Sequence, residues 1–194
     1  MFLPKKIGAA AGVAAPIIAF TCIFSSIATY PAFSWTNNAL SDLGVVSGIT
    51  GSLFNFGLCA AGILGFAFAV LGLYAYFKND WVGKLGSAFF AAATIALILI
   101  GIFNEHFSPT HYIVSVGFFS LAPIALFILT FAFWLNHHRG MSAFTIAVGL
   151  VAAIPWILQL TINYVPRVAI PEAISALVVA VWVIVFAAKM LKHS

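Results

Sequence analysis

Charged residues are the scarcest feature of this 194-residue sequence. Only 6% of its residues are charged, eight lysines and arginines against four aspartates and glutamates, whereas 64% are hydrophobic. Because a soluble domain usually carries about 25% charged residues, the composition excludes a water-soluble globular protein. Two cysteines are too few for a disulfide framework, and both lie in apolar segments, where cysteine is typically a small packing residue.

Long apolar runs make up most of the chain. A membrane-spanning helix needs about 20 mostly apolar residues, and it must be helical because lipid offers no hydrogen-bond partner to a free backbone. The sequence therefore predicts an all-α integral membrane protein, a six-helix bundle that forms one transmembrane domain over residues 1–194. The predicted spans are residues 7–30, 52–77, 82–103, 112–135, 142–164 and 171–191.

Lysine and arginine are distributed unevenly over the two sides of this bundle. Seven lie on the side that carries both termini, and Arg167 alone lies on the other side. Because cytoplasmic loops carry an excess of lysine and arginine, we expect a multi-pass protein of the cell membrane with cytoplasmic termini. The seven are Lys5, Lys6, Lys78, Lys84, Arg139, Lys189 and Lys192.

Most of the acidic residues fall on the expected outer side. Asp42, Glu105 and Glu172 lie there with His106 and His111, whereas the fourth acidic residue lies in a cytoplasmic turn. Arg167 is on the same outer side. We expect these six side chains to form the rim of a single site.

The outer halves of three predicted spans are more polar than a lipid-facing helix requires. Side chains four residues apart share a helix face, and polar groups at membrane depth normally face the bundle interior or a wet cavity. We therefore expect an outward-opening polar pocket lined by the first, second and fifth spans. Its polar side chains would be Thr21, Ser25, Thr29, Asn55, Gln159 and Asn163.

The longest predicted loop, residues 31–51, contains apolar residues that favour a short helix in the membrane interface. Asn37 or Asn38 would cap this helix, which would hold Ser41 and Asp42 over the pocket. The alternative is a plain interfacial helix with Asp42 in water. The expected anchors are Trp35, Leu40 and Leu43.

Small residues recur every four positions in two spans. Gly8 and Gly12 form a GxxxG pattern, and Gly57, Ala61 and Gly65 form a stripe in the second span. Such stripes let helices approach closely. We favour packing within one bundle over dimerisation, and the choice between monomer and homo-oligomer stays open.

Four segments of the sequence together resemble a known family: residues 38–44 (NALSDLG), 54–58 (FNFGL), 105–106 (EH) and 111–119 (HYIVSVGFF). The family that they resemble is the domain-of-unknown-function 998 family of small membrane proteins from archaea and bacteria. The resemblance covers nearly the whole chain, and it implies six spans with the residues of interest on the outer side. The Ser-Asp-Leu-Gly element is also similar to a stretch in six-span families of the DRAM and Frag/Sfk type, some of which are linked to lipid-anchor remodelling.

Binding of a lipid headgroup or another amphiphile at the outer leaflet is the function that requires the fewest assumptions about these residues. Arg167 would pair with a phosphate or carboxylate, while side-chain amides supply further hydrogen bonds. The alternative is that the polar groups only tie helices together. Membrane lipids are the expected partners, with no nucleic acid or soluble protein. The candidate ligand-binding residues are Asn38, Ser41, Asp42, Asn55, Glu105, His106, His111, Gln159, Asn163, Arg167 and Glu172.

Two further functions are compatible with the same side chains. In a metal-dependent intramembrane hydrolase, His106, His111 and Asp42, with Glu105 or Glu172, would hold a divalent metal such as zinc and activate a water to cleave a lipid ester or amide. The sequence has no HExxH or GxSxG motif to support this. A transporter would need the polar track to continue through the cytoplasmic halves of the spans, and these are mostly apolar.

Overall fold

The computed structural model describes residues 3–192, and within that range the chain contains helices, turns and loops but no strand. A π-helical segment, η2 (Phe68–Tyr74), continues the second long helix. The predicted all-α class is confirmed, and the predicted spans match the helices to within about one turn. The six long helices are α1 (Leu3–Ala28), α2 (Ile49–Ala67), α3 (Trp81–Ile102), α4 (Thr110–Leu135), α5 (Arg139–Ile162) and α6 (Ala169–Lys192).

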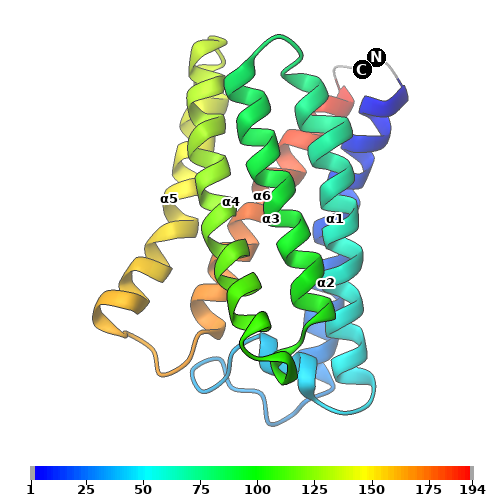
Figure 1. Cartoon of the computed structure of the whole chain (residues 1–194), viewed down its shortest axis with the longest axis vertical. Coiled ribbons are helices and arrows are strands. Elements are labelled where there is room, and N and C mark those ends of the chain that lie inside the picture. Colours follow the sequence, from blue (N-terminus) through cyan, green and yellow to red (C-terminus); the bar gives the residue numbers. More distant parts are fainter. Residues whose placement is uncertain (1–2, 193–194) are drawn as a thin grey trace.

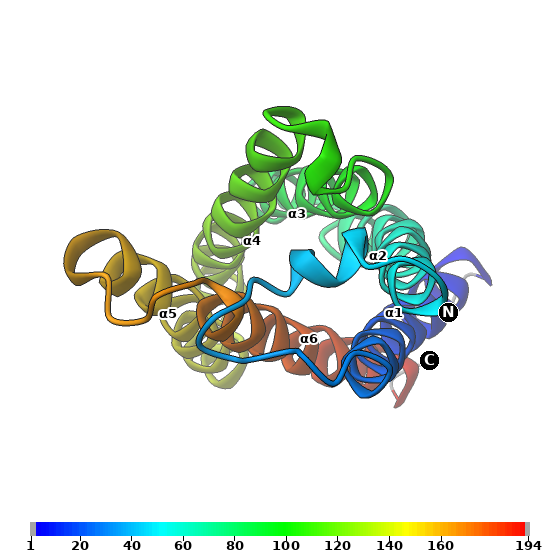
Figure 2. The ribbon, with the colours of Figure 1, turned by 90° about the horizontal axis from the view of Figure 1, so that it is seen from below.

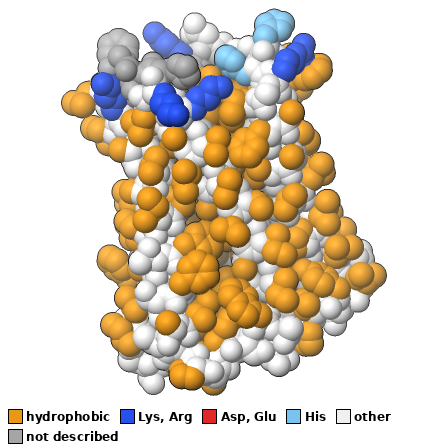
Figure 3. All heavy atoms as spheres, turned by 180° about the vertical axis from the view of Figure 1, so that it is seen from behind, with side chains coloured by type: hydrophobic (Ala, Val, Ile, Leu, Met, Phe, Trp, Pro, Cys, Tyr) orange, Lys and Arg blue, Asp and Glu red, His pale blue; other side chains and the backbone are white. Residues whose placement is uncertain are grey.

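All six helices, with η2 counted as part of α2, are long and apolar enough to cross a membrane. Their 22 to 26 residues correspond to about 33–39 Å at 1.5 Å per residue, somewhat more than the roughly 30 Å of a bilayer's hydrocarbon core. Hydrophobic side chains cover the middle of the face shown in Figure 3, and lysine and arginine gather at one end. The protein is therefore a multi-pass membrane protein.

The helices form a ring in which each packs against the next along the chain, and α6 closes the ring against α1 (Figure 2). Both termini lie at one end, which we call the terminal end (Figure 1). The opposite end is covered by the long connection between α1 and α2. We call this connection, residues 29–48, the cap, and the end that it covers the cap end.

The half of the ring nearest the terminal end is filled by large rings. Trp182 and Phe186 of α6 are fully buried and stack with their centroids 5.6 Å apart. Phe68 meets Phe186 edge to face, and Phe90 of α3 lies against Trp182. The Trp182 indole donates to the hydroxyl of Thr145 at 2.9 Å. We call Phe68, Phe90, Phe133, Trp182 and Phe186 the aromatic core.

Glycines let α1 approach its neighbours in this half. A side chain on Gly8 would overlap the backbone of Gly72, and one on Gly12 would overlap the ring of Phe68. The GxxxG pattern therefore serves packing inside the bundle, as predicted.

The last part of α5 turns away from the ring (Figure 1). Pro155 lies inside α5, seven residues before the helix ends at Ile162. Proline cannot donate the helical hydrogen bond to the carbonyl four residues before it, and its ring crowds that carbonyl, so we attribute the bend to Pro155. Beyond it, Leu160 and Ile162 are exposed on the outside of the bundle. The outer end of α5 therefore does not face the axis of the ring.

The candidate site: a polar cap over an apolar cavity

The cap contains a short helix, as predicted, but its anchoring differs from the prediction. The helix η1 (Ser41–Val45) is a 3-10 helix. Leu40 and Leu43 do not face outward as interfacial anchors would: they are buried inside the end of the ring, in one cluster with Phe54 and Ile100. Asn38 does not cap η1, since its side-chain oxygen accepts the backbone N–H of Ser34 instead. The cap is therefore part of the bundle core.

Asp42 is the centre of the hydrogen bonds that hold the cap in shape. Its carboxylate accepts the side-chain amide of Asn38 at 2.7 Å and the backbone N–H of Ala39 at 3.0 Å. The guanidinium of Arg167 lies 3.1 Å away and is 53% exposed. Partial burial raises the pKa of Asp42, but the hydrogen bonds from Asn38 and Ala39 and the charge of Arg167 outweigh it and hold the pKa below its usual value.

Two carboxyl groups of the surrounding helices also bind the cap. The Ser41 hydroxyl donates to Glu105, which lies in the 3-10 helix η3 (Glu105–Phe107), at 2.7 Å. Glu172, in the first turn of α6, accepts the backbone N–H of Leu40 and is only 7% exposed. The cap is thus fixed to both the α3–α4 connection and the start of α6.

A backbone carbonyl of the cap binds two asparagines. Gly44 accepts the side-chain amide of Asn55 at 2.9 Å and that of Asn104 at 3.3 Å. A side chain on Gly44 would overlap the side-chain oxygen of Asn55, so this position requires glycine. Sequence analysis missed Asn104, although its place beside Glu105 is a signal that could have found it.

The eleven candidate ligand-binding residues therefore divide into two groups. The structure brings together seven of them around the cap, and it holds four elsewhere. As ligand contacts, all eleven stay predictions. The cap group is Asn38, Ser41, Asp42, Asn55, Glu105, Arg167 and Glu172, and the other four are His106, His111, Gln159 and Asn163.

The two histidines do not converge with Asp42. His106 is exposed, whereas His111 is buried and its Nδ1 lies 2.7 Å from the carbonyl of Phe103. A carbonyl only accepts, so Nδ1 carries the proton and Nε2 faces the hydroxyl of Ser115 at 3.4 Å. Within residues 3–192, no three His, Cys, Asp or Glu side chains are grouped as a metal site requires. The metal set stays a prediction.

The polar residues of α5 are tied to the turn that follows it. Gln159 donates to the side chain of Asn163 at 2.7 Å and to the carbonyl of Val165 at 2.8 Å. Asn163 has the left-handed conformation that ends the helix. Since these contacts lie where α5 leaves the ring, the fifth span does not supply the polar wall that we expected.

The predicted polar stripe of α1 also faces away from the axis. Thr21 and Thr29 are exposed, and the fully buried hydroxyl in this region is that of Ser26, which donates to the carbonyl of Thr50 on α2 at 3.0 Å. The Thr29 and Thr50 hydroxyls lie 2.8 Å apart. These groups join α1 to α2 at the cap end.

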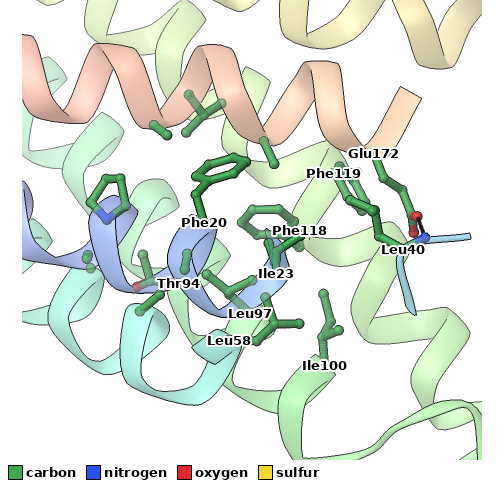
Figure 4. A pocket seen from close by; sticks show the side chains of 18 of the residues that line it. Phe20, Ile23, Leu40, Leu58, Thr94, Leu97, Ile100, Phe118, Phe119 and Glu172 are labelled. Atoms are coloured by element: carbon green, nitrogen blue, oxygen red, sulfur yellow. Dashed lines mark hydrogen bonds between the residues drawn. The ribbon is translucent and has the colours of Figure 1, made fainter. Parts of the chain in front are cut away.

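An apolar cavity of about 120 Å³ lies beneath the cap, inside the ring (Figure 4). It is lined by residues of α1, α2, α3, α4, α6 and the cap, and by none of α5. Along α6 it extends from Glu172 to Val183. These eleven steps of 1.5 Å make a length of roughly 16 Å, about half the hydrocarbon core of a bilayer. The pocket is therefore apolar, where the sequence predicted a polar one.

Small side chains leave the space for this cavity. Three helices each present a pair of small residues, four positions apart, to it. Residues at that spacing share a helix face, so the pairs thin the wall over a full turn. The sequence shows this pattern, but small pairs equally favour close helix packing. The pairs are Ala15 and Ala19 on α1, Ala61 and Gly65 on α2, and Ala176 and Ala180 on α6.

The few polar groups that line the cavity are mostly satisfied by the protein. Ser41 donates to Glu105, Thr94 donates to a carbonyl of its own helix at 2.7 Å, and Ser115 contacts His111. Glu172 differs, because Oε2 accepts from Leu40 while Oε1 has no hydrogen bond within residues 3–192. Among those residues, no lysine, arginine or histidine lines the cavity.

A family model described as "Protein of unknown function (DUF998)" matches residues 13–189, which include α2 to α5, the cap and every residue that lines the cavity. The chain belongs to this family. The resemblance drawn from the four sequence segments is thereby confirmed. No curated protein and no solved structure matches the chain.

Proposed function

We propose that this membrane protein binds a single apolar chain of an amphiphile in the cavity beneath the cap. The observation that carries the proposal is a cavity of about 120 Å³, with apolar walls and the length of about one bilayer leaflet. Amphiphile binding was the leading function from the sequence, with the headgroup as the recognised part. The apolar walls favour the chain instead.

The free-energy cost of an empty cavity supports the presence of a bound molecule. Leaving a cavity empty costs about 24 cal/mol per Å³ in protein cores, so 120 Å³ represents on the order of 3 kcal/mol. Larger apolar residues in place of the small pair Ala176 and Ala180 would occupy part of that space. The chain instead keeps small residues on three helices around one space, as a binding site requires.

The charge distribution supports an orientation for the site. The seven basic residues of the terminal end would lie on the cytoplasmic side of the cell membrane, because basic residues accumulate there. The cap would then be extracytoplasmic, and the cavity would extend from the outer surface to about the bilayer midplane. Its occupant would come from the outer leaflet. The hydrolase and transporter alternatives stay predictions.

A spin-labelled monoacylglycerol in phosphatidylcholine nanodiscs tests the proposal. Its head is uncharged, so binding requires no ionic contact, and electron paramagnetic resonance separates immobilised from mobile chains. We expect a saturable immobilised fraction with the wild-type protein. Ala176→Phe, which fills the cavity, should remove it.

Leu177→Phe is the matched control, because Leu177 follows Ala176 on α6 but is 50% exposed on the outside of the bundle. It should keep the immobilised fraction. The proposal is wrong if the wild-type protein shows no saturable fraction, or if Ala176→Phe keeps it at the level of Leu177→Phe. Thermal unfolding of both variants verifies that they are folded.

A further inference from the structure

Glu172 is the polar group with which the cavity meets its occupant. The side chain is 7% exposed and lines the cap end of the cavity (Figure 4). Oε2 is used by the backbone N–H of Leu40, and Oε1 is free within residues 3–192. An ionisable side chain at membrane depth is expensive to bury, and such residues typically belong to functional sites.

The charges around this end of the cavity are unbalanced. Asp42 and Arg167 form an ion pair and largely cancel each other. Glu105 and Glu172 remain, and both contact the same short stretch of the cap, at Ser41 and Leu40. An anionic headgroup at the cavity would be buried beside these carboxyl groups with no lining cation to balance its charge, and a buried charge without a partner is costly.

We propose that the polar end of the bound amphiphile is a hydrogen-bond donor, an alcohol or an amine, that contacts Oε1 of Glu172. This inference rests on the proposed function, and it replaces the sequence-based expectation that Arg167 binds a phosphate or carboxylate. An alcohol can donate to Oε1 or accept from it, and an amine can share one proton with the carboxyl group, so both pair with Glu172 in either of its protonation states. An ionised phosphate or carboxylate only accepts, and it brings a negative charge that no lining cation balances.

The alternative is that Glu172 has a purely structural role, and the test must distinguish this role from contact with the headgroup. An acidic side chain in the first turn of a helix is favoured by the helix dipole, and Glu172 already binds the cap. A purely structural Glu172 would hold the cap in place and would not distinguish one headgroup from another.

Competition for the immobilised fraction of the spin-labelled monoacylglycerol separates the two. Four competitors share one dodecyl chain and differ in the head: dodecanol, dodecylamine, dodecanoic acid and dodecyl phosphate. We expect dodecanol and dodecylamine to displace the label from the wild-type protein at concentrations at least about tenfold lower than the acid and the phosphate. Comparison of dodecanol with dodecylamine tells which donor is preferred.

Glu172→Gln sharpens the test. The glutamine oxygen can still accept from Leu40, and its amide then presents a donor to the cavity in place of Oε1. We expect this variant to lose its preference for dodecylamine by about tenfold, because its amide nitrogen can only donate at the position where the carboxyl group shares a proton with the amine. Arg167→Gln is the control, and it should leave the wild-type order of the four competitors unchanged.

Each outcome decides the inference. Equal displacement by all four competitors, or a preference for the acid or the phosphate, overturns it while the proposed function stands. A wild-type preference for anions that disappears in Arg167→Gln would assign the head to Arg167 instead. If the wild-type protein immobilises no label at all, the proposed function itself fails.

Discussion

The two halves of the bundle differ in the size of the side chains that face its interior. Near the terminal end the ring is filled by the aromatic core, with Trp182 and Phe186 fully buried. Near the cap end α1, α2 and α6 present alanine and glycine pairs, and a cavity remains. Phe90 belongs to both halves, since it contacts Trp182 and lines the cavity floor. We expect stability to be concentrated in the first half, and the binding that we propose lies in the second.

The halves also differ in how polar groups are used. The cap end holds a network of hydrogen bonds around Asp42, Glu105 and Glu172, whereas basic side chains at the terminal end gather on the surface (Figure 3). Hydrogen bonds between buried polar groups fix a geometry, while ring packing supplies most of the free energy. The cap is therefore positioned precisely above a space that the helices leave open.

The largest expected effect is in the aromatic core. Trp182→Ala removes a fully buried ring and its hydrogen bond to Thr145, and it should lower the free energy of unfolding by about 3–5 kcal/mol. Trp81→Ala is the matched control, because Trp81 is 73% exposed, and it should change stability by at most about 0.5 kcal/mol. Denaturant titration in detergent measures both. Equal losses would contradict the concentration of stability in this half.

An intermediate effect is expected from a change that disturbs the cap alone. A side chain on Gly51 would overlap the carbonyl oxygen of Val46, so Gly51→Ala should displace the cap and cost about 1–3 kcal/mol. Gly117→Ala is the control, since its new carbon would lie 3.8 Å from the nearest atom, on Ala96, and it should gain up to about 1 kcal/mol.

The same pair of variants also reports on binding. We expect Gly51→Ala to reduce the immobilised fraction of the spin-labelled chain, and Gly117→Ala to leave it unchanged. A Gly51→Ala protein with wild-type stability and wild-type binding would show that the cap is not the roof of the cavity.

The smallest expected effect is a pH dependence of the cap. Because its pKa is lowered in the folded protein, Asp42 stabilises the cap at pH values above its ordinary pKa of about 4, and this contribution is lost as the pH falls through the folded-state pKa. It should amount to at most about 1 kcal/mol, since the Arg167 partner is largely exposed.

Asp42→Asn should remove this dependence. The pH dependence of the cap is measured by hydrogen exchange at the backbone amide of Ala39, which donates to Asp42. The intrinsic effect of pH on exchange is subtracted. Faster exchange toward acid pH in the wild-type protein but not in Asp42→Asn is the expected result. The same acid response in both proteins would assign it to another group.

The sequence predicted the helices and the contents of the cap, and the reasons are physical. Six apolar runs must be helices in lipid. The assignment of the connecting loops to one side of the bundle was enough to predict that Asp42, Glu105, Arg167 and Glu172 lie at the same end. Which helix face points inward was not predictable. In a membrane both the inner and the outer face of a helix are apolar, so no period distinguishes the lining residue Ala176 from its outward neighbour.

The sequence predicted a polar pocket, whereas the cavity is apolar, and the reason is related. Polar side chains at membrane depth satisfy one another first, as Gln159 does with Asn163 and as Thr29 does with Thr50. They therefore mark helix ends and helix contacts more often than a cavity wall. The bend at Pro155, which takes the end of α5 out of the ring, could be expected from the proline but not its direction.

Photolabelling tests the central claim most directly, namely that an apolar chain occupies the cavity beneath the cap. A monoacylglycerol with a diazirine near the end of its chain would be irradiated with the protein in nanodiscs, and the labelled residues would be identified by mass spectrometry. We predict labels on Phe90 and Thr94, at the inner part of the cavity, that excess unlabelled monoacylglycerol prevents. Labels confined to outward-facing residues such as Ile63 and Ile95, without protection by competitor, would contradict the account.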